Sequence, residues 1–357
     1  MSGFQRLSVD GFRRLCGVNI DFKDRPLCVM IGANGSGKTS VLEVMSLLAA
    51  SAQGKLGDRI SELGGIGAVL TAGRSEMSFQ LTAGSGAGPL QYDLSIETSG
   101  IGYSLKAEGL AHIGRGTITL RAKVASETGL SDARSLLKPA ADFRERLASS
   151  AYYHMLDVGP RSQVRLPQPM RPAKLPGKNG EDLVTCLYDM RETEPDAFET
   201  VEDSLRAAFP GFVQLTFPPV AAGTLAMIWR DRNFPTGFYS HQLSEGMLRF
   251  LWLATLLQSS ALPEVVLLDE PEVSLHPELL NLLAHQLREA AQRSQIIVAT
   301  HSDRLVRFLK PEEVLVADLT EEGLAKLTWA DSLDLEKWLD EYTLDEVWGI
   351  GRLGGRA

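Results

Sequence analysis

Residues 32–40 have the sequence GANGSGKTS, which brings five kinds of small or polar residue and a lysine into one short segment. The segment follows the apolar run LCVMI and precedes a helical pattern from about Lys38 to Ala50. Backbone N–H groups of a glycine-rich loop at a helix N-terminus can surround a polyphosphate. Lys38 can then neutralise the β and γ phosphates, and the hydroxyl of Thr39 can ligate Mg²⁺. The spacing therefore predicts a nucleotide site formed by Gly32, Asn34, Gly35, Ser36, Gly37, Lys38, Thr39 and Ser40.

A second apolar run, VVLLDE at 265–270, ends in two adjacent carboxylates. A buried strand should not end in two acids unless they are solvated, paired or bound to a metal. Asp269 is predicted to join Thr39 in the magnesium shell, and Glu270 to orient and deprotonate an attacking water. A third apolar run, QIIVAT, delivers His301 just past its end, where open parallel sheets bind ligands. The predicted catalytic residues are Glu270, His301 and Lys38.

The segment LSEG at 243–246 opens a helix that is apolar on almost every side. Ser244 is a natural N-cap for this helix. Capping does not explain Gly246, because glycine costs about 1 kcal/mol in a helix relative to alanine. A residue this small lets a phosphate approach a helix N-terminus. Since the loop at 32–40 already supplies one such site, we infer that Ser244 and Gly246 serve the nucleotide of a second protomer.

The elements that must position these residues follow from the periodicity of the chain. Short strands precede the glycine loop, and residues 76–124 alternate with period two, which predicts an antiparallel meander. Helical segments, the strand-like AYYHML and a Pro-rich stretch follow, and then buried parallel strands with a helix between them. We expect an N-terminal part of the nucleotide-binding lobe at 1–130, a helical insertion at 131–215, a C-terminal part of that lobe at 216–345 and a flexible tail at 346–357.

Composition limits the classes of function. The 357 residues are 44% hydrophobic and 23% charged, and no apolar run approaches the roughly 20 residues of a membrane span. The first ten residues lack a secretory signal pattern, and the three cysteines have no C-x-x-C spacing, so a cytoplasmic protein without a membrane partner is expected. A net charge of −9 argues against coating nucleic acid with the whole surface. The basic stretch 161–178 leaves local contact with DNA open, with a solvated face as the alternative.

In order and spacing, these motifs resemble ABC-type ATPases of the branch that contains structural-maintenance-of-chromosomes and RecF-like proteins. The resemblance implies an α/β fold, a P-loop NTPase head with a mixed central sheet, an antiparallel β subdomain and a helical insertion. It also implies ATP and Mg²⁺ as cofactors and hydrolysis of ATP to ADP and phosphate. Two heads would form an ATP-dependent homodimer, each nucleotide lying between the Walker motifs of one head and the signature, Leu243 to Met247, of the other. Ser244 and Gly246 would then contact the γ-phosphate, and Glu270 would be the base.

The sequence departs from the family pattern in two places. Glu245 stands where transporters usually have glycine. The Q-loop glutamine has no clear match; Gln163 is a candidate and Arg161 an alternative that could face phosphate. Arg13 is a further candidate for reaching the nucleotide, with exposed scaffolding as its alternative.

Several biological roles fit these motifs. ATP turnover could serve DNA maintenance or repair, or drive an anti-phage or toxin defence system. Alternatively, a nucleotide-dependent regulator or scaffold could control a separate effector, such as a nuclease or toxin, through the acidic segment near the C-terminus. A transporter subunit is less favoured, because about 200 residues separate Lys38 from Ser244 and no membrane segment is present.

Overall fold

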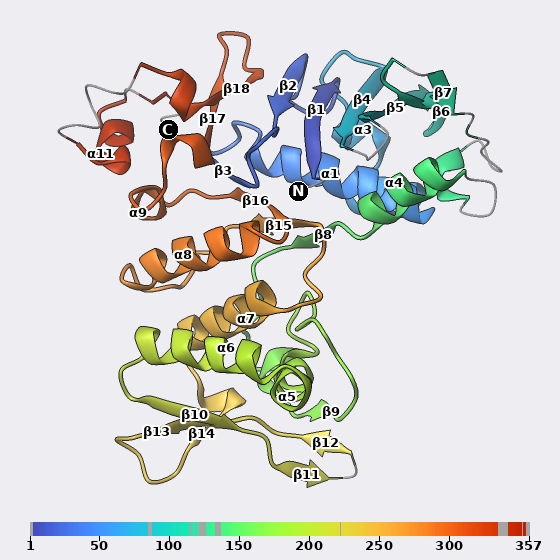
Figure 1. The fold of residues 1–357 in the computed structure, drawn as a ribbon. Coiled ribbons are helices and arrows are strands. Elements are labelled where there is room, and N and C mark those ends of the chain that lie inside the picture. Colours follow the sequence, from blue (N-terminus) through green and yellow to red (C-terminus); the bar gives the residue numbers. More distant parts are fainter. Residues whose placement is uncertain are drawn as a thin grey trace. The chain divides into compact units, whose positions relative to one another are not determined.

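The computed structural model describes residues 3–84, 88–114, 116–118, 120, 126–132, 137–221, 223–334, 342–351 and 353–354. The chain forms two compact units (Figure 1). Unit 1 comprises Met1–Tyr152, Pro263–Asp269 and Ser294–Ala357; unit 2 comprises Tyr153–Leu262 and Glu270–Arg293. The chain first passes from unit 1 to unit 2 after Tyr152. The sequence suggested that the insertion begins near residue 130. The signature segment and the part of the insertion that follows Tyr152 therefore belong to the same unit.

The mixed sheet of unit 1 has the strand order β18-β17-β3-β16-β15-β8. The strands are β3 (Leu27–Gly32), β8 (Ala151–Tyr153), β15 (Val265–Asp269), β16 (Gln295–Ala299), β17 (Val314–Leu319) and β18 (Ala325–Trp329). Parallel pairing joins β17 to β3, β3 to β16 and β16 to β15, and β18 pairs antiparallel at one edge. Almost every residue of the three central strands is buried, which explains their continuous apolar sequences.

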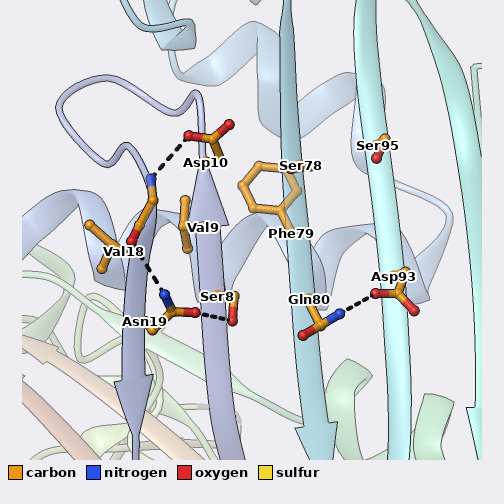
Figure 2. Close-up of a pocket in the computed structure, with 11 residues that line it drawn as sticks. Ser8, Val9, Asp10, Val18, Asn19, Ser78, Phe79, Gln80, Asp93 and Ser95 are labelled. Atoms are coloured by element: carbon orange, nitrogen blue, oxygen red, sulfur yellow. Dashed lines mark hydrogen bonds between the residues drawn. The ribbon is translucent and has the colours of Figure 1, made fainter.

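The second sheet of unit 1 is antiparallel, with the order β2-β1-β4-β5-β6-β7. Its strands are β1 (Phe4–Asp10), β2 (Val18–Asp21), β4 (Glu76–Ala83), β5 (Leu90–Ser99), β6 (Gly102–His112) and β7 (Gly116–Ile118). Burial alternates along β5, so one face joins the core and the other is polar. On the polar face, Ser8 donates to Asn19 at 2.6 Å and Gln80 to Asp93 at 2.8 Å, around an open hollow of about 430 Å³ (Figure 2). Side chains of this face thus bond one another across neighbouring strands.

Helix α1 (Lys38–Gln53) is the central element of the core of unit 1. Its side chains Val41, Leu42, Val44 and Met45 are fully buried in one cluster with residues of both sheets. The helix continues three residues past the expected end near Ala50 and stops where Gly54, at φ 73°, adopts a left-handed conformation. The other α-helices that the structure describes in this unit are α2 (Leu56–Glu62), α3 (Ile66–Val69), α4 (Lys138–Ala148), α9 (Asp303–Val306) and α11 (Leu344–Gly349).

Unit 2 is built around four helices: α5 (Leu183–Thr193), α6 (Pro195–Ala208), α7 (Glu245–Gln258) and α8 (Leu279–Ala291). Two small sheets accompany them, β10 (Phe212–Thr216) with β13 (Ile228–Asp231) and β14 (Phe238–Tyr239), and β11 (Pro219–Ala221) with β12 (Thr224–Leu225) and β9 (Gln168–Pro169). Trp229 is fully buried, with its ring 4.5 Å from that of Phe212 and 5.3 Å from that of Phe209. These contacts form the aromatic centre of the unit.

The architecture confirms the expected fold class. A mixed central sheet, an antiparallel sheet and inserted helices are all present. In the segment expected to be a flexible tail, α11 extends to Gly349 and Leu353 is buried. Parts of two expected features, the last strand of the meander at 119 and 121–125 and the acidic segment at 335–341, lie outside the described residues. Among the helices that the structure describes, none has the length and apolarity needed to cross a bilayer.

Candidate nucleotide site

The glycine loop ends at the first turn of α1, where Gly37 is the N-cap with a φ of 106°. No side chain in the described part of the chain caps this helix, and its first turn contains no acid. The leading N–H groups of a helix have no partner within the helix, and they carry the positive end of its dipole. The end of α1 is therefore suited to an anion, as the spacing GANGSGKTS predicted.

Two glycines of the loop are also required by packing inside unit 1. A Cβ on Gly32, at φ 145°, would collide with the backbone carbonyl of Ala317 on β17. A Cβ on Gly37 would lie 3.1 Å from Ala325 Cβ and 3.2 Å from Leu15 Cδ2. The absence of a side chain at these two positions therefore lets the loop lie directly against the sheet.

The polar residues of the loop are held close to its backbone. Lys38 is 3% exposed, and its Nζ donates to the carbonyl oxygens of Gly32 at 2.6 Å and Ala33 at 2.8 Å. Ser36 is fully buried, and its Oγ has no hydrogen-bond partner among the described residues. A buried hydroxyl without a partner is costly and needs an explanation. A phosphate oxygen at this loop would supply its partner. The other loop residues assigned to the nucleotide differ in exposure: Asn34 and Gly35 are exposed and Ser40 is buried.

Asp269 lies at the same sheet edge as the glycine loop because the parallel strands are in register. Asp269 on β15 pairs with Ala299 on β16, and Ala299 pairs with Met30 on β3. Thr39 Oγ1 lies 3.4 Å from Asp269 Oδ1, longer than the usual 2.7–2.8 Å hydrogen bond between oxygens. Mg²⁺ is typically bound through one or two carboxylates together with substrate phosphates and water. This hydroxyl and carboxylate fit that ion.

Tyr152 contacts the same carboxylate and was not identified from the sequence. Its hydroxyl donates to Asp269 Oδ2 at 3.0 Å, and the side chain is 4% exposed. Burial, and then the neighbouring negative charge of Asp269, raises the pKa of this phenol far above its ordinary value, so it stays a donor. The sequence indicated only that AYYHML is strand-like, and this pattern does not reveal the partner of Tyr152.

Arg13 is paired inside unit 1. Its guanidinium forms an ion pair of 2.5 Å with Glu43 on α1, and Arg13 itself has a left-handed φ of 48°. Glu43 is 8% exposed, and burial raises its pKa although Arg13 opposes the rise. The structure thus gives Arg13 a partner on the helix that follows the glycine loop.

The two remaining catalytic candidates follow the ends of parallel strands. His301 is exposed, two residues beyond the end of β16, in the same unit as Lys38. Glu270 directly follows Asp269 and begins the second segment of unit 2. Its φ of 50° is left-handed, a conformation that costs energy for a residue with a side chain and that is concentrated at functional sites.

The signature segment caps helix α7 as predicted. Ser244 is exposed, and its Oγ accepts a hydrogen bond of 3.3 Å from the backbone N–H of Met247. Gly246 has a role that sequence analysis missed, because a Cβ there would lie 2.8 Å from the backbone carbonyl oxygen of Ser274. The missing side chain therefore makes room for the chain after Glu270, whether or not a phosphate also approaches.

Arg165 holds the backbone that leads into the signature. Its Nη1 donates to the carbonyl of Leu243 at 2.8 Å and approaches those of His241 and Ser240 at 3.2 and 3.4 Å. Its Nε donates to the carbonyl of Val158 at 2.8 Å. Sequence analysis singled out Arg161 and Gln163, and the side chains of both are exposed.

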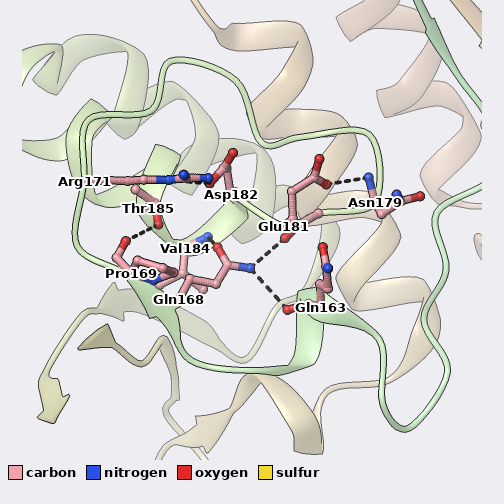
Figure 3. Close-up of polar contacts among 10 residues, drawn as sticks. Gln163, Gln168, Pro169, Arg171, Asn179, Glu181, Asp182, Val184 and Thr185 are labelled. Atoms are coloured by element: carbon pink, nitrogen blue, oxygen red, sulfur yellow. Dashed lines mark hydrogen bonds and ion pairs between the residues drawn. The ribbon is translucent and has the colours of Figure 1, made fainter. Parts of the chain in front are cut away.

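The Pro-rich basic stretch folds onto unit 2 through its own polar contacts (Figure 3). The buried amide of Gln168 donates to the carbonyl of Gly180 at 2.6 Å and accepts from the N–H of Val184 at 2.8 Å. Arg171 pairs with Asp182 at 2.6 Å. Lys174 pairs at 2.9 Å with Asp189 and also with Glu194. Acidic side chains of unit 2 thus neutralise part of the positive charge that was considered for contact with DNA.

Solved structures with a similar fold include heads of structural-maintenance-of-chromosomes proteins. A "SmcHead bound to the C-winged helix domain of ScpA" has a TM-score of 0.62 at 14% identity, covering 91% of this chain and 97% of that chain. A Smc head domain from Pyrococcus furiosus, with an extended coiled coil and bound to the C-terminal domain of ScpA, has a TM-score of 0.60 at 13% identity, covering 95% and 98%. These likenesses confirm the fold.

Sequence relatives confirm the kind of protein. The L-cystine transport system ATP-binding protein TcyN of Escherichia coli (strain K12) is 30% identical over 96 residues, 26% of this chain and 38% of that protein. The family model described as "AAA domain, putative AbiEii toxin, Type IV TA system" matches residues 27–307, from β3 to just beyond α9. The match covers most of the chain, so the chain belongs to this family of AAA-domain proteins, and its fold is similar to that of SMC heads.

Proposed function

We propose that the protein is a magnesium-dependent ATP hydrolase that dimerises when it binds ATP. The observation that carries the proposal is the uncapped start of α1 beside Lys38, with Thr39 facing Asp269 across 3.4 Å. This arrangement offers backbone donors and a cation to a triphosphate, and two oxygens to a metal ion. A bound Mg²⁺ would stabilise the negative charge that develops on the phosphate oxygens during hydrolysis.

Each residue of the proposed site has a separate role in ATP binding or hydrolysis. The loop amides and Lys38 bind the β and γ phosphates, and Thr39 with Asp269 would hold the metal ion. Glu270 accepts a proton from the attacking water, and His301 contacts the γ-phosphate. Ser244 and Gly246 bind the γ-phosphate of a second copy, so two chains together complete each site.

We propose that ATP hydrolysis by this protein serves a defence or toxin-associated role, with DNA maintenance as the alternative. The description of the matching family names a toxin system, which supports the first. The pairing of Arg171 with Asp182, and of Lys174 with Asp189 and Glu194, reduces the charge available to DNA. A regulator that controls a separate nuclease or toxin fits the same observations.

The test of the nucleotide site is ATP binding by Lys38→Ala, measured calorimetrically. Loss of a charged donor should weaken binding by roughly 10- to 100-fold. Lys55→Ala removes an exposed lysine just after α1 and should bind ATP like the wild type. Equal affinity of both variants would exclude this phosphate site.

ATPase rates measured with and without duplex DNA at increasing salt separate the defence role from DNA maintenance. Stimulation by DNA that falls as salt is raised favours DNA maintenance.

A further inference from the structure

The carboxylate of Asp269 has a different hydroxyl at each oxygen. Thr39 lies beside Oδ1 at 3.4 Å, and Tyr152 donates to Oδ2 at 3.0 Å. All three residues belong to unit 1, and Tyr152 is on β8, the strand next to β15 in the sheet. A carboxylate held at one oxygen cannot turn freely about its Cβ–Cγ bond. The shorter bond, to Tyr152, therefore sets which oxygen faces Thr39.

The ring of Tyr152 is itself held in place. Tyr152 belongs to the buried core of unit 1, together with Val265 and Leu267 of β15. The guanidinium of Arg59 lies 5.8 Å from the centre of its ring. Packing on this scale restricts the phenol to one position, so its hydroxyl is a preorganised donor.

We propose that Tyr152 is a positioning residue that turns Oδ1 of Asp269 toward the magnesium shell. The inference rests on the proposed function, because it assumes that Asp269 and Thr39 hold a metal ion with ATP. Magnesium demands near-octahedral geometry and tolerates misplaced ligands poorly. Partners that orient a metal ligand typically change metal affinity by about 10- to 100-fold when they are removed.

The chain provides a matched control in the next residue. Tyr152→Phe and Tyr153→Phe each remove one phenolic oxygen from a buried tyrosine of the same short strand. The Tyr153 ring packs against Trp252 at 5.7 Å, and its hydroxyl has no hydrogen-bond partner among the residues that the structure describes. A general effect of losing a hydroxyl in β8 would appear in both variants. Loss of positioning would appear only in Tyr152→Phe.

The experiment measures Mn²⁺ binding by electron paramagnetic resonance in the presence of ATP, and ATP binding in EDTA by calorimetry. We expect Tyr152→Phe to bind Mn²⁺ about 10-fold more weakly, with ATP affinity in EDTA unchanged, and Tyr153→Phe to match the wild type. Wild-type Mn²⁺ affinity in Tyr152→Phe would overturn the inference. So would an equal loss in both variants. A wild-type protein that binds no ATP would instead overturn the proposed function.

A double-mutant cycle checks that Tyr152 acts through Asp269. In an Asp269→Ala background, adding Tyr152→Phe should produce no further loss of Mn²⁺ affinity, because the carboxylate that it orients is gone. A further loss of similar size in that background would show that Tyr152 acts on the metal site by another route, and the positioning role would be wrong. Circular dichroism of each variant confirms that the fold is retained.

Discussion

The backbone carbonyl of Ser274 faces the Cα of Gly246, so that a Cβ on residue 246 would stand 2.8 Å from the carbonyl oxygen. Ser274 itself has a left-handed φ of 64°. The contact joins the start of the signature helix to the loop that begins at Glu270, and all of these residues lie in unit 2. The glycine is therefore needed by the isolated chain, before any second protomer is considered.

Gly246→Ala should lower the free energy of unfolding by about 1–3 kcal/mol, because the new methyl group forces the Ser274 carbonyl to move. Urea denaturation of the nucleotide-free protein measures this. Glu245→Ala, at the exposed neighbouring position, is the control and should change stability by less than about 0.5 kcal/mol. If Gly246→Ala proved as stable as the control, the contact with Ser274 would have no energetic weight.

Ser244→Arg should leave ATP binding by the monomer intact and prevent ATP-dependent dimerisation, since a bulky side chain would stand where a partner's γ-phosphate is proposed to bind. The variant also loses the cap on Met247, at about 1 kcal/mol. Ser244→Asp separates the two effects, because aspartate is an equally good cap yet repels phosphate. Light scattering with Mg²⁺ and ATP should show monomers for both variants. Dimers of Ser244→Asp would indicate that Ser244 is only a helix cap.

Glu270→Gln should bind ATP normally and lose roughly 100-fold or more in kcat, because an amide cannot accept the proton of the attacking water. With turnover blocked, the ATP-bound dimer should accumulate and be visible by size-exclusion chromatography with light scattering. Glu321→Gln, a substitution of the same kind at an exposed loop position, should behave as wild type. Normal turnover by Glu270→Gln would remove this residue from the role of base.

The thiols should differ in reactivity. Burial raises the pKa of Cys186 to about 12 and that of Cys28 still further, whereas Cys16 is half-buried. Because only thiolates react readily, a disulfide reagent at pH 8 should label Cys16 quickly in the folded protein and all three cysteines after denaturation. Rapid labelling of three thiols in the folded protein would contradict this.

The same shift has a consequence for stability. A folded-state pKa above the unfolded value means that the folded state prefers the neutral thiol. The contribution of Cys186 is complete below about pH 9, the ordinary thiol value, and declines as the pH rises toward about 12. Cys186→Ser should reduce this decline in the free energy of unfolding, measured by urea titration between pH 8 and pH 10.

Local features of the site could be predicted from the sequence because adjacent residues create them. The glycine loop, the N-cap Ser244 and the strand that ends at Asp269 each depend on a few consecutive residues and on the backbone geometry that they favour. The end of α1 was placed three residues early, because its apolar pattern weakens after Ala50 although the glycine that stops it stands at position 54.

The glycine loop, the strand that ends in two carboxylates and the order of the elements can be read from the amino-acid sequence, because they follow from short-range spacing and periodicity. The folded structure was needed to show that Tyr152 bonds Asp269, 117 positions away, and that Arg165 holds the carbonyl of Leu243. It also decided that Gly246 makes room for Ser274. Such partners are set by how distant strands and loops are brought together, and residue type restricts what a side chain can bond without specifying which distant atom it will meet.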